Sequence, residues 1–320
     1  MSHKFDVVVF GSCIVDFISY VPRLPKIGET LHGTKFVTGF GGKGANQCVA
    51  AARLGSRTAI IGKLGDDPWG KNYHDALRLE GVNVEHVDIV DGESTGIAQI
   101  NVAENGDNQI VIVVGANNCL EPADVHKGAE LLSNANVLVC QLETPLNATI
   151  EALKNFAGTS IMNAAPALES VPLDLLEYST IFCVNETEAA LLTGLQVETV
   201  MHAKAALLKL RDMGCGTVII TLGEKGAIFA MKNSTKVKHV KPIHVERVVD
   251  TTGAGDAFIG ALAHFIAKNP STGLTECIAA ANRVAAMSVQ KPGTQISFPR
   301  FEETGLPLDV SSYQSEWEYI

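Results

Sequence analysis

The sequence predicts an α/β protein with a three-layer α/β/α core, a mainly parallel central sheet and a second, small β-sheet. Short runs rich in Val and Ile alternate with helix-like stretches along most of the 320 residues. These runs are apolar throughout, which is typical of parallel strands covered by helices on both faces. Two segments, 14–38 and 95–114, break this alternation and resemble short strands around turns.

The strands and helices of the core follow one another in order. The strand-like runs are DVVVFG (6–11), TAIIGKLG (58–65), NVLVCQLE (136–143), TSIMNAA (159–165), TIFCVN (180–185) and TVIITLG (217–223), with a further short strand at 245–249. Helices that pack on the sheet are indicated by the apolar spacing in NQCVAAARLG, HAKAALLKLRDMG and AFIGALAHFIA.

The two segments that break the alternation predict a β lid. Residues 95–114 form two strand-like arms around Asn105-Gly106-Asp107, a typical hairpin turn, and residues 14–38 read as short strands interrupted by Pro22 and Pro25. We expect a small antiparallel sheet over the carboxyl ends of the core strands, and an ordinary surface hairpin is the alternative. Open edges on such a lid favour a homodimer formed through it.

The domain organisation follows from these assignments. Residues 1–13, 39–94 and 115–310 are expected to form the α/β core, and residues 14–38 and 95–114 the β lid. The last ten residues, 311–320, read as a C-terminal tail that lies over the surface.

Composition narrows the class of protein. With 46% hydrophobic and 19% charged residues, the chain can bury a large core. A net charge of −10 argues against a nucleic-acid surface, and no apolar run approaches the length of a membrane span. The seven cysteines are scattered without a CxxC pair, which predicts reduced thiols and a cytoplasmic location, with the nucleus as an alternative.

The segment DTTGAGDAFIGA (250–261) is a glycine-rich turn that leads into a helix. Gly253 and Gly255 allow the backbone to approach a ligand, and the amides of the turn together with the helix N-terminus suit an anion. Asp256 adds a carboxylate there, which suits phosphoryl transfer because it can accept the proton of an attacking hydroxyl. The alternative is that Asp256 only caps its helix.

A second glycine-rich turn, GFGGKGAN (39–46), contains the pattern GxGxxG. A dinucleotide site is disfavoured because no clean strand precedes the turn and no acidic residue closes the strand that follows. A Walker A loop is excluded because Gly44, and neither Ser nor Thr, follows Lys43. The turn can instead offer Lys43 and the amide of Asn46 to a polyhydroxylated ligand, and a purely structural turn is the alternative.

Carboxylates also follow two of the core strands. Asp16 follows the first strand and Glu143 ends the run 136–143, so both are expected at the carboxyl edge of the sheet, where ligands bind. There Asp16 could accept hydrogen bonds from two neighbouring hydroxyl groups. The alternatives are an Asx turn for Asp16 and a helix cap before Pro145 for Glu143.

Two further motifs follow later strands. In Asn185-Glu-Thr-Glu188 the amide could cap the next helix and the acids enrich its first turn, or the acids could order hydrated Mg²⁺ and phosphates. The turn Thr221–Gly226 suits nucleotide contacts, and an ordinary hairpin turn is the alternative.

In combination and in order, these motifs resemble the signatures of the ribokinase-like (PfkB) carbohydrate kinases, from about residue 6 to residue 300. Within that family GGKGANQ, Gln141-Leu-Glu143, Asn163–Ala167 and Lys291–Ser297 are most similar to the members that act on ribose. The resemblance implies ATP-dependent phosphorylation of D-ribose at the 5-hydroxyl, giving ribose 5-phosphate and ADP. Another acceptor (deoxyribose, fructose or adenosine) and a non-catalytic sugar- or nucleotide-binding protein are the alternatives.

The resemblance also implies a role for each matching position. Asp256 is the catalytic base, and the amides of Gly253, Ala254 and Gly255 are its anion hole. The sugar is held by Asp16, Gly42, Lys43, Asn46 and Glu143. The ATP site is lined by Asn185, Thr221, Gly223, Gly226, Gly255 and Asn282, with Glu188 in the Mg²⁺ environment. An activating K⁺ is held by Asp250, Thr252, Ser288, Lys291, Gly293 and Ser297. The chain departs from some members at Ile14, where they carry Asn, which predicts one sugar hydrogen bond fewer.

Overall fold

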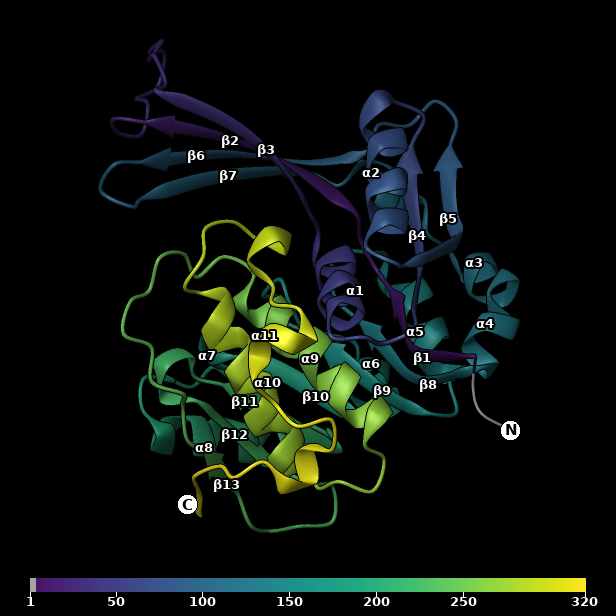
Figure 1. Cartoon of the computed structure of the whole chain (residues 1–320), viewed down its shortest axis with the longest axis vertical. Coiled ribbons are helices and arrows are strands. Elements are labelled where there is room, and N and C mark those ends of the chain that lie inside the picture. Colours follow the sequence, from purple (N-terminus) through teal and green to yellow (C-terminus); the bar gives the residue numbers. More distant parts are fainter. Residues whose placement is uncertain (1–3) are drawn as a thin grey trace.

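The computed structural model describes residues 4–320 and contains two β-sheets (Figure 1). In the large sheet, the strands from β11 to β5 run parallel, and β12, β13 and β14 continue it as antiparallel strands. The spatial order is β14 (Trp317–Tyr319), β13 (Lys238–Val240), β12 (Ala227–Ala230), β11 (Thr217–Thr221), β10 (Ile181–Asn185), β9 (Thr159–Asn163), β8 (Ala135–Cys140), β1 (Phe5–Phe10), β4 (Thr58–Gly65) and β5 (Asn83–Val90).

Helices cover both faces of this sheet, as predicted. Successive strand residues point to opposite faces, so Val7 and Val9 of β1 join one apolar cluster while Val8 and Phe10 join the other. The first cluster includes α1 (Lys43–Arg53), α2 (Pro68–Leu79), α9 (Ala254–Lys268) and α10 (Leu274–Ser288). The second includes α3 (Pro122–Lys127), α4 (Ala129–Ser133), α5 (Leu146–Lys154), α6 (Leu173–Tyr178), α7 (Glu186–Thr193) and α8 (Val200–Asp212).

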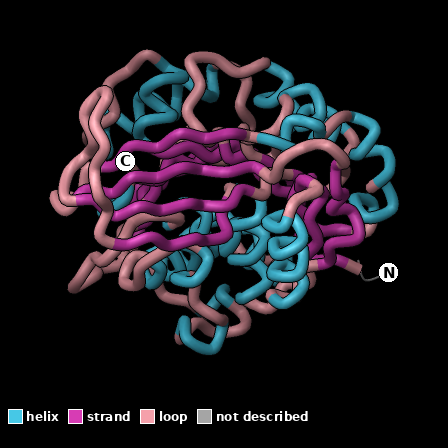
Figure 2. The backbone as a smooth tube through the Cα atoms, turned by 90° about the horizontal axis from the view of Figure 1, so that it is seen from above, coloured by secondary structure: helices cyan, strands magenta, loops and turns pink. Residues whose placement is uncertain are grey.

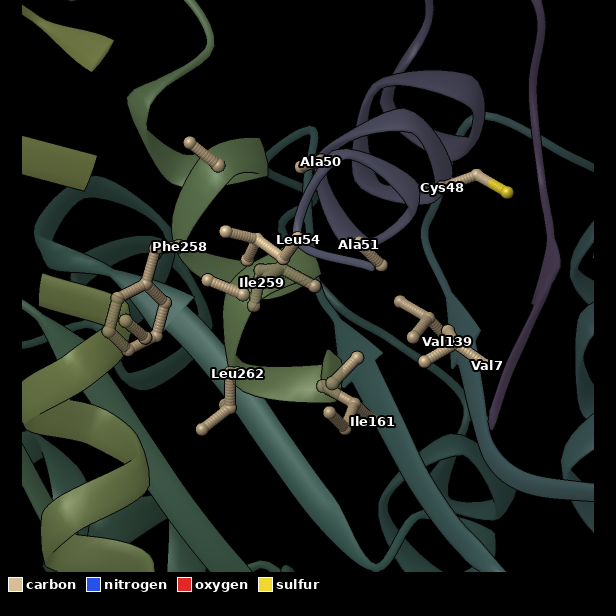
Figure 3. Packing of buried hydrophobic residues seen from close by; sticks show 14 of the residues in the cluster. Val7, Cys48, Ala50, Ala51, Leu54, Val139, Ile161, Phe258, Ile259 and Leu262 are labelled. Atoms are coloured by element: carbon tan, nitrogen blue, oxygen red, sulfur yellow. The ribbon is translucent and has the colours of Figure 1, made fainter. Parts of the chain in front are cut away.

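Helices α1 and α9 lie side by side on the first face. Figure 3 shows Leu54, at the end of α1, beside Ile259 of α9, with strand side chains such as Val139 and Ile161 in the same cluster. A Cβ atom added at Gly260 of α9 would lie 2.5 Å from the carbonyl oxygen of Gln47 in α1. Only glycine permits this approach, and it brings the first turns of both helices together.

The small sheet is a separate layer that projects from the core in Figure 1, and its four strands lie side by side in Figure 2. Its order is β3 (Lys35–Gly41), β2 (Ile14–Val21), β6 (Gly96–Ala103) and β7 (Asn108–Val113). The predicted hairpin turn joins β6 to β7, where the Gly106 N–H donates to the Ala103 carbonyl at 2.9 Å.

Two details of the small sheet differ from expectation. The sheet is mixed, because its central strands β2 and β6 pair in parallel from Ile14↔Gly96 onward. Both strands leave the core in the same direction, so an antiparallel pair could not form. In addition, β3 continues to Gly41, three residues beyond the predicted end of the segment at residue 38.

The predicted strand at 245–249 is wrong, since this segment is irregular. Val248 and Val249 are exposed, and the Val249 N–H bonds to the Val289 carbonyl of the turn after α10. The tail 311–320 does more than lie on the surface: it ends in β14, which pairs with β13. Short helical turns complete the chain: η1 (Gly115–Cys119), η2 (Gly223–Lys225), η3 (Gln295–Ser297), α11 (Phe301–Thr304) and η4 (Val310–Ser312).

Among residues 4–320, no helix combines the length and the apolar character that crossing a membrane requires.

Candidate active site

Most of the predicted site residues gather where the parallel strands end. Asn185 and Thr221 are the last residues of β10 and β11, and Glu143 lies three residues beyond β8. In an open parallel sheet the carboxyl edge is the place where ligands bind. Burial, and then the negative charges of Glu143 and Asp256, raise the pKa of Asp16 to about 7. The three carboxyl groups therefore share one region.

Asp256 lies in the first turn of α9. The helix begins at Ala254, after Gly253 with a φ of 78°, and Gly253 occupies the cap position. The carboxylate of Asp256 is buried and accepts the amide groups of Asn46 and Gln47, each at 2.9 Å. The alternative role as a simple helix cap is therefore wrong: the side chain is bound by another helix.

The residues of the predicted anion hole form the turn into α9. The Ala254 N–H donates to the Thr251 carbonyl at 3.2 Å, which closes the turn. A Cβ atom added at Gly255 would meet no atom of residues 4–320 within 4 Å, so this face of the turn is open.

Lys43 is the cation of this region. Burial alone would lower the pKa of its ammonium group, but three nearby carboxylates outweigh burial and raise it: Asp256, Glu143 and Glu188. Lys43 is the first residue of α1, and Gly42 precedes it with a φ of 83°. Lys43 is therefore a protonated amine whose charge offsets part of the negative charge of these carboxylates.

Glu143 holds the N-terminus of α1. Its Oε2 atom accepts the backbone N–H of Lys43 at 2.8 Å and the hydroxyl of Ser12 at 2.6 Å. The predicted alternative, a cap for the helix after Pro145, is not formed, since the cap position there is Pro145 and makes no side-chain hydrogen bond. Sequence reasoning missed Ser12, which fixes this carboxylate from the loop after β1.

Asp16 lies inside β2, where it pairs with Gly39, and so makes no Asx turn. A Cβ atom added at Gly41 would lie 2.4 Å from Asp16 Oδ2. Gly41 therefore leaves the room that this carboxylate occupies. Ile14, where the chain departs from some relatives, is buried at the start of β2.

Asn185 and Glu188 form a reciprocal cap on α7. The Glu188 N–H donates to Asn185 Oδ1 at 2.9 Å, and the Asn185 N–H donates to Glu188 Oε2 at 2.8 Å. The capping role is therefore present. Burial also raises the pKa of Glu188, and the hydrogen bond from the Asn185 N–H and then the charge of Lys43 oppose this shift.

The remaining predicted nucleotide residues lie on the β11 side. Thr221–Gly226 is both the end of β11 and the hairpin turn into β12, with φ of 51° at Gly223 and 84° at Gly226. Asn282 lies on α10, and its Nδ2 atom is buried without a hydrogen-bond partner among residues 4–320. A buried donor without a partner is available to a ligand.

Two of the predicted cation residues, Thr252 and Gly293, bind the carboxylate of Asp250. Its carboxylate accepts the N–H of Thr252 and of Gly293, both at 2.9 Å, and so joins two loops. Burial acts to raise the pKa of Asp250, but these hydrogen bonds outweigh it and lower the pKa. Three side chains point elsewhere: Lys291 pairs with Glu303, and the hydroxyls of Ser288 and Ser297 donate to carbonyls of their own turns.

Within the described part of the chain, no group of three His, Cys, Asp or Glu side chains has the arrangement of a metal site.

Four side-chain amides around Asp256 received no role from the sequence: those of Gln47, Gln141 and Asn163, which are buried, and that of Gln295, which is half-buried. Gln47 donates directly to the Asp256 carboxylate, and Gln295 donates to Asn46, which in turn binds that carboxylate. Gln141 and Asn163 both form hydrogen bonds with Gln47. A signal existed: Gln47 interrupts the apolar stretch NQCVAAA, and Gln141 follows the apolar strand β8. A polar residue at a buried position requires partners, but the sequence does not say which.

The fold and the site define a phosphotransfer enzyme: a parallel α/β core, a second sheet, and a buried carboxylate at a glycine-rich helix start beside a lysine. The GxGxxG turn is not a dinucleotide site, because the strand before it, β3, belongs to the small sheet. The chain belongs to the pfkB family of carbohydrate kinases, whose model matches residues 4–300. It is an ATP-dependent carbohydrate kinase.

Relatives within this family are similar over nearly the whole chain. Mouse (Mus musculus) ribokinase is 43% identical over 305 residues, which cover 94% of each protein. A deoxyribokinase of Salmonella typhi is 40% identical, covering 93% of this chain and 97% of its own. The structure of Arabidopsis thaliana ribokinase complexed with ribose and ATP is 32% identical, with a TM-score of 0.88 over 98% of this chain and 100% of that one.

Proposed function

We propose that this enzyme transfers the γ-phosphoryl group of ATP to the 5-hydroxyl of D-ribose, giving D-ribose 5-phosphate and ADP. The observation that carries the proposal is the placement of Asp256, buried at the start of α9 beside Asn46 and in the region of Asp16 and Glu143. Ribokinases from mouse and Arabidopsis support the choice of sugar.

In this reaction Asp256 acts as the base. A carboxylate is too weak a base to ionise an alcohol in advance, so it orients the 5-hydroxyl and takes its proton late. Positioning and charge neutralisation account for most of the rate in a loose transition state. The amides of Gly253, Ala254 and Gly255 at the start of α9 would receive the charge that develops on the transferred group. The Ala254 N–H would then have to turn from the Thr251 carbonyl to the phosphoryl group.

Five residues would hold the sugar. Asp16 accepts hydrogen bonds from two neighbouring hydroxyls, since a carboxylate offers several lone pairs. Glu143 has one oxygen occupied by Ser12 and the start of α1, and its Oε1 atom would serve the sugar. Gly42, Lys43 and Asn46 come from the same helix start.

ATP would bind along Asn185, Thr221, Gly223, Gly226, Gly255 and Asn282. The unpartnered Nδ2 atom of Asn282 supports a role in recognising the base. ATP is used together with Mg²⁺, which neutralises phosphate charge when bound. Because both carboxylate oxygens of Glu188 accept hydrogen bonds from Asn185, this residue would act on the hydration shell of the ion and not as a direct ligand.

We also infer an activating K⁺ held by oxygen atoms of Asp250, Thr252, Ser288, Lys291, Gly293 and Ser297. Asp250 joins the loop before α9 to the loop 291–297, so a cation there would order the anion hole. Replacing K⁺ by N-methylglucamine should lower kcat and the thermal midpoint of the free protein together. If neither changes, the cation site is wrong.

The deoxyribokinase relative supports a second acceptor. At 40% identity, the Salmonella enzyme is nearly as similar as the mouse ribokinase. Ile14 offers no hydrogen bond where some family members have Asn, which weakens selection for a hydroxyl. Deoxyribose is therefore the competing substrate to measure.

ADP release with Mg·ATP and K⁺ tests the proposal against five conditions: D-ribose, deoxyribose, fructose, adenosine and no acceptor. Fastest turnover with ribose supports it. Turnover only with another acceptor would retain the kinase and change the sugar. If folded protein binds ATP but releases no ADP under any of these conditions, the proposal is overturned and a non-catalytic binding protein is favoured.

We propose that the enzyme is a homodimer joined through the small sheet, working in the cytoplasm, with the nucleus as an alternative. Edge strand β7 supports the dimer: four successive apolar residues, Ile110–Val113, are each about half exposed. Seven free cysteines support a reducing compartment.

A further inference from the structure

The carboxylate of Asp256 is held at both oxygens by neighbouring residues of α1. Asn46 Nδ2 donates to Oδ2 and Gln47 Nε2 donates to Oδ1, each at 2.9 Å. Gln47 is fully buried, and its partners are all protein groups. It therefore lies behind the carboxylate, away from any ligand.

The amide of Gln47 is fully used. Its second N–H donates to Asn163 Oδ1 at 2.9 Å, and its Oε1 atom accepts Gln141 Nε2 at 2.7 Å. A carboxylate only accepts hydrogen bonds, so the NH₂ group of Gln47 must face Asp256 and its oxygen must face Gln141. Asp256 thus sets the direction of the whole chain of amides.

The far end of this chain is left without a partner. Gln141 Oε1 is buried and accepts no hydrogen bond from residues 4–320. It lies against the backbone of Gly11, where an added Cβ atom would be 2.2 Å away. A buried oxygen without a hydrogen bond lowers the stability of the folded protein, and an apolar side chain at position 141 would not carry this cost. Stability alone does not explain why a glutamine stands there.

We propose that Gln47 is a positioning residue for the catalytic carboxylate, and that Gln141 fixes Gln47 in turn; this rests on the proposed function of Asp256. With Oδ1 held on the core side, the remaining acceptor capacity of Oδ2, which already accepts one N–H from Asn46, would serve the substrate hydroxyl. The close approach of α1 and α9 at Gly260 keeps both ends of this contact on rigid helices. A base that is misplaced by a fraction of an ångström loses rate without losing substrate affinity.

Gln47→Met and Gln47→Glu test the contact. Met keeps the volume without a donor, and Glu keeps the shape but places an acceptor against Asp256. We expect kcat to fall about 10-fold or more for Met and further for Glu, with KM for ribose and ATP within about 2-fold of wild type. Thr149→Val is the matched control: Thr149 is equally buried and hydrogen-bonded, but lies on the opposite face, and kcat should not change.

Gln141→Met separates positioning from stability. Removing the unsatisfied oxygen should leave the thermal midpoint unchanged or higher, while kcat falls about 3-fold or more because Gln47 can turn. This variant decides the matter if the Gln47 variants fail to fold. An unchanged kcat in a folded Gln47→Met or Gln141→Met protein would overturn the inference. A variant whose KM rises while its kcat stays the same would also overturn it.

The wild-type enzyme, assayed beside the variants with all acceptors, keeps the two proposals apart. If the wild-type enzyme is active and the Gln47→Met variant is equally active, only the positioning role of Gln47 is contradicted. If the wild-type enzyme releases no ADP with any acceptor, the proposed function is contradicted, and the positioning role of Gln47 is contradicted as well.

Discussion

At the scale of single residues, the site is an arrangement of opposite charges in a buried place. Lys43 faces the carboxylates of Asp256, Glu143 and Glu188, and burial raises the pKa of two carboxyl groups, Asp16 and Glu188. Such groups destabilise the free protein and are retained where a ligand uses them. Each one gives a testable consequence.

Replacing Asp256 by Ala removes the base. We expect kcat to fall at least ~10²-fold, the usual contribution of a positioned base. Binding of ATP, measured by calorimetry, should persist because all of the proposed nucleotide residues except Gly255 lie on β10, α10 and the segment from β11 into its turn. Turnover close to that of the wild type would contradict the assignment.

Asp16 should make sugar binding depend on pH. Its pKa is about 7, so it is mostly neutral at pH 6 and mostly charged at pH 8. The charged form accepts more hydrogen bonds, so KM for ribose should rise up to about tenfold between pH 8 and pH 6. We would measure KM and kcat in parallel over this pH range. A KM for ribose that does not change between pH 6 and pH 8 would contradict the role of Asp16 ionisation in sugar binding.

The same group should affect stability. The pKa of Asp16 is raised from 3.8 to about 7 by folding, so the folded protein holds this proton more tightly and loses stability as pH rises between these values. Asp16→Asn should therefore raise the thermal midpoint at pH 8 by more than at pH 4. An equal shift at both pH values, in matched thermal melts, would mean that ionisation of Asp16 has no effect.

Gly41 should be intolerant of any side chain. A Cβ atom there would be 2.4 Å from Asp16 Oδ2, so Gly41→Ala should displace the carboxylate and raise KM for ribose severalfold, with KM for ATP nearly unchanged. Gly28→Ala is a useful comparison, since its Cβ would meet nothing within 4 Å. If both substitutions act alike, the loss reflects general backbone strain, because Gly28 has a φ of 77°.

At the scale of elements, the C-terminal strand β14 reaches the nucleotide turn through one histidine. His239 of β13 is buried, and its Nε2 bonds to the Lys225 carbonyl at 2.7 Å. Its Nδ1 lies 3.6 Å from Glu318 of β14. Lys225 belongs to the turn 221–226, so β14 covers the residue that holds this turn.

Removing residues 316–320 should therefore loosen the nucleotide turn. We expect KM for ATP to rise about 3-fold or more while KM for ribose stays the same, because Asp16 lies in β2 and Glu143 follows β8, both away from β13 and β14. Glu318→Gln, which keeps the strand, should have a smaller effect. A truncated enzyme with the wild-type KM for ATP would show that β14 does not stabilise the nucleotide turn.

The elements also show what the sequence could predict. All six apolar core strands were predicted from their runs, because burial on both faces demands apolar side chains. Strands such as β5, with NVEHVDIV, and β14, with exposed side chains, were missed because an edge strand needs few apolar residues. The site residues on strand ends were recognisable, whereas the contact between Gln47 and Asp256, 209 positions apart, depends on helix packing.

At the scale of the whole molecule, the small sheet ends in an edge that nothing in residues 4–320 covers. We expect a particle of twice the chain mass of 34.0 kDa in light scattering. Ile112→Lys on β7 should produce the monomer by placing like charges at the interface. Leu79→Lys, on an exposed residue of α2, should leave the dimer intact. A 34.0 kDa wild-type species would contradict the dimer.

The seven free cysteines provide this protein with internal probes of its own opening. Six are buried, and burial raises the pKa of their thiols, so they cannot react with an alkylating reagent until the structure around them opens. Four belong to one face of the large sheet and two, Cys140 and Cys215, to the other. The order in which these thiols are alkylated would therefore record which layer of helices detaches first, in the unmodified enzyme and without an added label.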